Sequence, residues 1–136
     1  MTNEELTSLQ ERIAASPGLR SLENRLKSEL LGSPEQNGYG LDPFTILFII
    51  SIILQVIQLC RQNRSDADVM LDMANAAVLP PRKLMRLKRR LNVLWRKHCS
   101  ERGIEPGERN PFFTAALNAV KAVSRDEIAD IVQASN

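Results

Sequence analysis

The amino-acid sequence predicts an all-α protein, with about seven short helices in a single domain of residues 1–136. Of its residues 43% are apolar and only 4% are aromatic, which is enough for a modest core in a chain of this length. Apolar residues recur at helical spacing, and alternating β-branched runs are rare outside one apolar segment. Helix-start signals recur along the chain, which is typical of a bundle of short helices.

Residues 1–31 are predicted to form a pair of helices. Thr2 followed by Glu5 is a capping box for a first helix that ends near Ala15. Ser16 and Pro17 then supply an N-cap and a first-turn proline for the second helix. The second helix carries a stripe of leucines that ends at Gly32: Leu19, Leu22, Leu26 and Leu30. These stripes are expected to face a core.

Residues 32–42 are predicted to be a glycine-rich loop, and residues 43–63 a helix of almost uninterrupted apolar sequence. Asp42 and Pro43 supply the cap and the first-turn proline of this helix. The strongly polar residues of its apolar run continue into Gln62 at spacings of four, three and four, so they stack into one narrow stripe. The polar stripe consists of Ser51, Gln55, Gln58 and Gln62.

The apolar helix must be buried in a membrane, in its own domain or between copies of the chain. The run from Phe44 to Cys60 would span roughly 26 Å, just short of the roughly 30 Å hydrocarbon core. Arg61 and Arg64 would hold its C-terminal end in the cytoplasm if it crossed a membrane. Its glutamines are costly in lipid unless they bond across helices. We therefore predict burial in protein, with the polar stripe along an inter-subunit seam or lumen, and membrane insertion is the alternative.

Residues 65–100 are predicted to contain a helix that starts at Ser65 and a basic helix over residues 82–100, with two prolines between them. Between residues 82 and 97 there are eight basic side chains and no acid. The whole chain has a net charge of only +2, so the remainder holds ten basic and sixteen acidic residues. Positive charge is therefore concentrated on one helix.

The basic helix is amphipathic at 100° per residue. One side carries the apolar residues and the histidine: Leu84, Leu87, Leu91, Leu94, Trp95 and His98. The other side is the candidate site for nucleic acid or another anionic surface, and its residues are Arg82, Lys83, Arg86, Arg89, Arg90, Arg96 and Lys97.

Three interpretations of the basic helix are open. In the first, its charges are solvated or pair with acids elsewhere, Glu4, Glu5, Glu11 and Asp126 among them. In the second, they contact phosphates with no base-reading motif, so binding is independent of sequence and sensitive to salt. In the third, the helix lies on an anionic membrane surface, with Trp95 and the leucines in the interface.

Residues 103–109 are predicted to form a second loop, and residues 110–136 a C-terminal helical pair. Asn110 and Pro111 supply the start signal of its first helix. Ser124 and Glu127 form the cap pair of its second helix.

No catalytic site, metal site or cofactor is predicted. The chain has one histidine, His98, and neither a glycine-rich phosphate loop nor a nucleophile elbow. Cys60 and Cys99 have no metal-ligand spacing, so free thiols in a reducing compartment are expected. Met1 opens into a polar, acidic stretch, which predicts no cleavable secretion signal.

These features predict a non-enzymatic structural or assembly subunit that oligomerises through its hydrophobic helix and presents its basic helix to nucleic acid or an anionic surface. An internal or connector protein of a virus particle is one setting that combines these properties, so the virion or the cytoplasm is the favoured location. The alternative is a single-pass or interfacial membrane-anchored adaptor. A soluble, sequence-independent DNA-binding protein is the third prediction.

Overall fold

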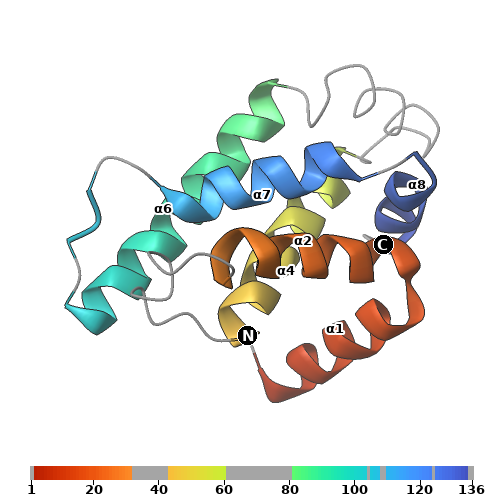
Figure 1. The fold of residues 1–136 in the computed structure, drawn as a ribbon, viewed down its shortest axis with the longest axis horizontal. Coiled ribbons are helices and arrows are strands. Elements are labelled where there is room, and N and C mark those ends of the chain that lie inside the picture. The colour runs from red at the N-terminus through yellow and green to blue at the C-terminus, as the bar shows by residue number, and fades with distance from the viewer. Residues whose placement is uncertain are drawn as a thin grey trace.

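The computed structural model describes residues 2–31, 43–60, 81–103, 105–107, 110–123 and 125–134. These ranges contain six helices and no strand, which confirms the all-α prediction. The helices are α1 (Asn3–Ala15), α2 (Pro17–Leu31), α4 (Pro43–Cys60), α6 (Pro81–Arg102), α7 (Pro111–Ala122) and α8 (Arg125–Ala134) (Figure 1). The predicted helix that starts at Ser65 lies outside the described residues, so the count of about seven stays a prediction.

The first two helices begin at the caps that the sequence predicts. At α1, the Thr2 hydroxyl accepts a hydrogen bond from the backbone N–H of Glu5 (3.1 Å), and the Glu5 carboxylate accepts one from the N–H of Thr2 (2.9 Å). At α2, the Ser16 hydroxyl accepts from the N–H of Leu19 (3.3 Å). These bonds satisfy N–H groups that have no partner inside their own helix.

The two distinctive helices have slightly different bounds from the predicted ones. The apolar helix, predicted over residues 43–63, is described as far as Cys60, and the remainder lies outside the described residues. The basic helix, predicted over residues 82–100, extends to Arg102. Gly103 then has a φ of 65°, a left-handed conformation that favours glycine and ends the helix, and Gly107 in the following segment has a φ of 64°.

The apolar helix α4 lies at the centre of the bundle and packs against each of the other five described helices. Its buried side chains are Thr45, Ile46, Leu47, Ile49, Ile50, Ile53, Leu54, Val56 and Ile57. The chain therefore buries most of this helix within its own core, and the other described helices cover its apolar sides. Among the described residues, no helix combines the length and hydrophobicity that crossing a membrane requires, and this includes the segment that the sequence made a transmembrane candidate.

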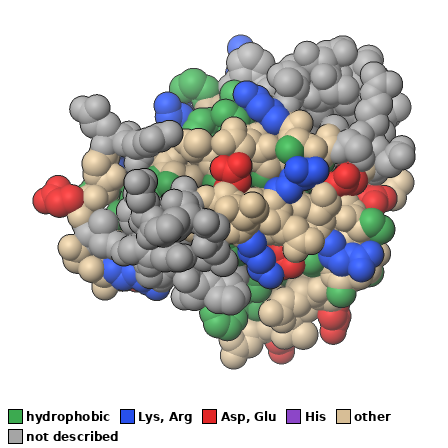
Figure 2. Space-filling view, viewed as in Figure 1, with side chains coloured by type: hydrophobic (Ala, Val, Ile, Leu, Met, Phe, Trp, Pro, Cys, Tyr) green, Lys and Arg blue, Asp and Glu red, His purple; other side chains and the backbone are tan. Residues whose placement is uncertain are grey.

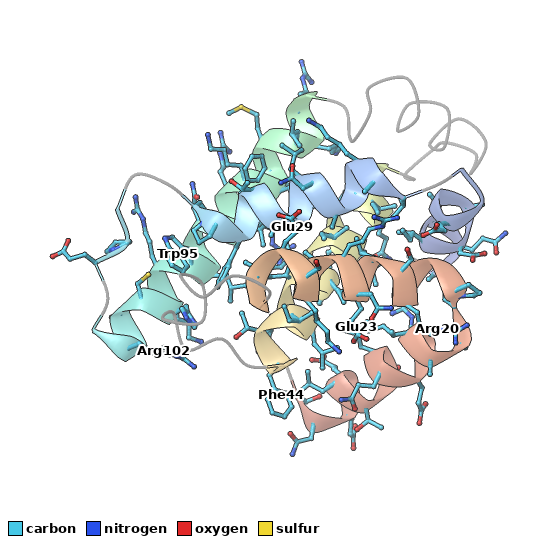
Figure 3. All side chains as sticks on the ribbon, viewed as in Figure 1. Arg20, Glu23, Glu29, Phe44, Trp95 and Arg102 are labelled. Carbon is cyan, nitrogen blue, oxygen red and sulfur yellow. The ribbon has the colours of Figure 1, made fainter. Side chains whose placement is uncertain are left out.

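Helix α2 supplies the second large part of the core. Its four predicted leucines are completely buried. It packs against α7 and α8, and Figure 1 shows α2 and α7 side by side with α4 behind them. Glu29 of α2 points toward α7 (Figure 3), where its carboxylate accepts a hydrogen bond from the Asn118 side chain at 3.4 Å. Leu9 and Ile13 of α1 are buried in the same core.

Candidate nucleic-acid interface

The basic helix α6 is fixed to the bundle by one side and exposes the other. Leu87, Leu91 and Trp95 are buried, and Leu84 and Leu94 pack partly against the core. These residues recur at spacings of three and four, so they form the side that packs on α4 and α7. The residues on the opposite side of α6 therefore face solvent.

The structure gathers the seven predicted anion-binding residues on the solvent side of α6. Arg82, Arg86, Arg89, Arg90, Arg96 and Lys97 are exposed, and Lys83 is half-buried. From residue 82 to residue 97 the helix rises about 22 Å. Arg82, Lys83, Met85, Arg86 and Arg89 also line a shallow hollow at the N-terminal half of the helix.

None of these seven side chains forms an ion pair with a described residue. In the described part of the chain, the ion pairs are Lys27 with Glu23 (3.5 Å) and Arg102 with Glu101 (3.8 Å). Lys88 is different, because its ammonium group lies 5.8 Å from the centre of the Phe113 ring. The predicted pairing of the basic face with Glu4, Glu5 and Glu11 is therefore not observed, and the side chain of Asp126 lies outside the described residues.

A cluster of three rings joins α6 to α7. Trp95 stacks on His98 with ring centres 5.9 Å apart, and both rings meet the edge or face of Phe112 at 5.0 and 5.5 Å. The indole N–H of Trp95 donates to the carbonyl of Pro106 at 3.0 Å. Figure 3 shows Trp95 on the part of α6 that α7 approaches. Trp95 is only 4% exposed, so it packs in the core of the described bundle, and contact of α6 with an anionic membrane surface stays a prediction.

Asn92 is a positioning residue that the sequence reading missed. Its side-chain oxygen accepts a hydrogen bond from the amide group of Asn110. The side-chain oxygen of Asn110 accepts in turn from the backbone N–H groups of Phe112 (3.0 Å) and Phe113 (3.3 Å), which caps α7 as predicted. Asn92 therefore connects the basic helix to the start of its neighbour. In the sequence, the only indication of this contact is that Asn92 is a polar residue next to the apolar stripe of α6.

The polar stripe of α4 borders the basic face of α6 at Arg90. Ser51 is half-buried, Gln55 and Gln58 are exposed, and Gln62 lies outside the described residues. The amide of Gln55 donates to the Ser51 hydroxyl at 3.5 Å. These three residues line an open cavity of about 840 Å³, together with Glu4, Glu5, Ser8 and Arg12 of α1 and Arg90 of α6. Their role as an oligomer seam stays a prediction.

The histidine and the cysteine of α6 are both packed inside. His98 is 5% exposed and Cys99 is 1% exposed. Burial raises the pKa of the Cys99 thiol, because a thiolate loses hydration in an apolar surrounding. In the described part of the chain no three metal-binding side chains come together, and the side chain of Cys60 lies outside it.

Helix α6 thus presents an exposed basic face that forms no ion pair with a described residue, on a helix whose opposite side packs against α4 and α7. Figure 2 shows a different face, over α1 and α2, where basic and acidic side chains are interspersed.

Comparisons with protein-family models, with curated proteins and with solved structures find no significant match to this chain.

Proposed function

We propose that this protein is a non-enzymatic nucleic-acid-binding protein that holds the phosphate backbone on the exposed face of α6 without reading sequence. One observation carries the proposal. Of the seven predicted anion-binding residues of α6, six are exposed and Lys83 is half-buried, and none of the seven forms an ion pair with a described acid. A surface of one sign on a fixed support attracts a polyanion and keeps its charges in place during binding.

The physical consequence is a steep dependence on salt. Each phosphate that a basic side chain neutralises releases condensed counterions, so affinity falls as salt is added. If about five of the seven residues meet phosphates, log K falls against log salt with a slope of about −4.5. No base-reading motif accompanies the basic residues, so affinity should vary little between sequences of one duplex type.

The test uses two variants that remove the same charge. In the first, Arg86, Arg89 and Arg96 of α6 are replaced by glutamine. In the matched control, Arg20, Arg25 and Lys121, which are exposed on α2 and α7, are replaced by glutamine. Fluorescence anisotropy with a labelled duplex of about 20 base pairs, across a salt series, should show weaker binding and a flatter slope for the first variant only.

Either of two results would reject the proposal. The unmodified protein could fail to retain the duplex at low salt. Alternatively, both variants could lose affinity equally, which would mean that net charge alone is responsible and α6 has no special role.

We further propose that copies of the chain associate through the polar stripe, defined in the described region by Ser51, Gln55 and Gln58. The supporting observation is that Gln55 and Gln58 are exposed on a helix whose other sides are mostly buried, beside an open cavity. Amide groups that become buried between subunits fix the register of the contact. In an assembly of several copies, such as one in a virus particle, the total number of phosphate contacts would rise with the number of copies.

A further inference from the structure

We infer that the ligand of α6 is a B-form DNA duplex, and that α6 lies in its major groove. This inference rests on the proposed function, because it specifies which nucleic acid the basic face holds. It is carried by the arrangement of the basic side chains in two rows, by an exposed apolar side chain between the rows, and by the position of the nearby aromatic rings.

Five of the exposed basic residues of α6 form two rows that diverge, whereas Arg82 lies between the rows at the N-terminal end of the helix and Lys88 lies outside them. At about 100° per residue, Arg89 and Arg96 point to one side of the exposed face. Arg86, Arg90 and Lys97 point to the other side, about 90° away on the helix circumference. A helix that lies on a single strand needs one row of charges. Two diverging rows fit a helix between two phosphate backbones, because each row then meets a different strand.

An apolar side chain lies between the rows. Val93 is 69% exposed, the highest value among the exposed large apolar residues described. An apolar side chain gains nothing from contact with phosphates, so the exposure of Val93 among arginines is not explained by phosphate binding. In a major groove the centre of an inserted helix faces the base edges, where an apolar side chain leaves the phosphate contacts to the flanking basic residues. Val93 therefore occupies the position that faces the bases.

The dimensions and the aromatic rings favour this duplex over other nucleic acids. An α-helix with its side chains is about 10–12 Å across, and the major groove of B-form DNA is about 12 Å wide. The major groove of A-form RNA is too narrow and deep for side chains to read. Single strands are typically held by exposed aromatic platforms, whereas Trp95 is buried and Phe113 is half-buried near Lys88.

The support of α6 allows the face to enter a groove as a rigid element. Figure 1 shows α6 running along one side of the bundle, with α7 across it. Its opposite side is held in the core by Leu87, Leu91 and Trp95. Binding therefore requires no opening of the bundle, and the exposed face is presented in the conformation that the groove accepts.

The experiment compares ligands of equal length on the unmodified protein. A DNA duplex of about 20 base pairs, the RNA duplex of the same sequence and the single DNA strand are measured at one salt concentration. We expect the DNA duplex to bind at least about tenfold more tightly than either of the others, which corresponds to about 1.4 kcal/mol. Methyl green, which occupies the major groove, should displace the protein, and netropsin, which occupies the minor groove, should not.

Replacements of Val93 test whether its side chain faces the groove in the complex. Val93→Glu adds a carboxylate between the rows and should weaken duplex binding at least about tenfold. The negative charge would be repelled by the phosphates of both strands. Val93→Ala should bind within about threefold of the unmodified protein, because the groove contact is only shortened. The charge control is Gln10→Glu, at an exposed position of α1, and it should bind like the unmodified protein.

The outcomes separate this inference from the function on which it rests. Equal affinity for all three nucleic acids, displacement by netropsin alone, or an unchanged affinity of Val93→Glu would overturn the major-groove placement and leave phosphate binding by α6 intact. Failure of all three nucleic acids to bind at low salt would overturn both.

Discussion

The carboxylate of Asp130 in α8 accepts a hydrogen bond at 3.2 Å from the backbone N–H of Gly18, in the first turn of α2. The two residues are 112 positions apart in the chain. The first N–H groups of a helix have no partner within it, and the partial positive charge at a helix start favours a carboxylate. The last described helix thus caps the second one, which closes the bundle from end to end.

Gly18→Ala should destabilise the protein, although helix propensity alone predicts the opposite. A Cβ at this position would lie 2.4 Å from the carbonyl oxygen of Glu127 and 2.7 Å from the Cβ of Asp130. Such contacts force α2 and α8 apart, at a cost of about 1–3 kcal/mol, whereas Gly to Ala in an open helix gains about 1 kcal/mol. Urea unfolding followed by Trp95 fluorescence measures the change. Asn24→Ala, at an exposed site of α2, is the control, and a Gly18→Ala protein as stable as that control contradicts the prediction.

Asp130→Ala should cost about 1 kcal/mol, because the N–H of Gly18 loses its acceptor. Asp130→Asn keeps an acceptor oxygen and should cost less. Gln133→Ala, at an exposed site of the same helix, should change stability by less than about 0.5 kcal/mol. The same unfolding measurement applies. Equal effects of the Asp130 and Gln133 replacements would mean that the tertiary cap contributes nothing.

Asn92 and Asn110 should be energetically coupled. Asn110→Ala removes the cap of α7 and should cost about 1–2 kcal/mol, and Asn92→Ala should cost about 0.5–1.5 kcal/mol. Because they share one hydrogen bond, the double variant should lose at least about 0.5 kcal/mol less than the sum of the two single changes. A double-mutant cycle by urea unfolding measures this difference. Strict additivity would show that the bond between the two side chains has no net effect.

The Cys99 thiol should be protected from reagents until the protein unfolds. Its side chain is 1% exposed, and burial raises its pKa above the ordinary value of 9.0, so little reactive thiolate forms at neutral pH. A Cys60→Ser background isolates Cys99 for labelling with a thiol reagent, with and without urea. Rapid labelling of the native protein would contradict the burial of this side chain.

The same thiol should make stability fall at alkaline pH. Below the ordinary pKa the thiol is protonated in both states, so its contribution does not change with pH. Above 9.0 the unfolded chain releases the proton and the folded chain retains it, so stability falls until the raised folded pKa is passed. Cys99→Ala should show a shallower decline in the free energy of unfolding above pH 9 than the unmodified protein.

Replacing Gln55 and Gln58 by leucine should change the size or order of the assembly. If the polar stripe is an inter-subunit seam, the amides set its register, and leucines remove that constraint. Light scattering coupled to size exclusion, at low and high salt, measures the mass. Asn24→Leu, which adds an apolar side chain at an exposed site of α2, is the control for non-specific association. An unaltered mass would count against the seam.

Much of the helical framework was predictable because its signals are local. A cap depends on residues three positions apart, so Thr2 with Glu5 could be recognised, and so could Asn110 before Pro111. The leucines of α2 and the apolar side of α6 follow from spacing within one helix. The exposure of the basic residues on the opposite side of α6 follows from the same spacing.

The tertiary structure alone decided what each helix packs against. The apolar sequence of α4 is compatible with lipid, with other copies or with its own domain, and five neighbouring helices of the same chain supply the answer. Periodicity could not reveal that Trp95 lies inside, that Asn92 reaches Asn110, or that Asp130 caps α2, because these contacts join distant parts of the sequence. The sequence by itself determined the helices and their polar and apolar sides, since those depend on neighbours one turn away. The partners of those sides depend on how the chain as a whole fills its core, and only the folded arrangement supplies that information.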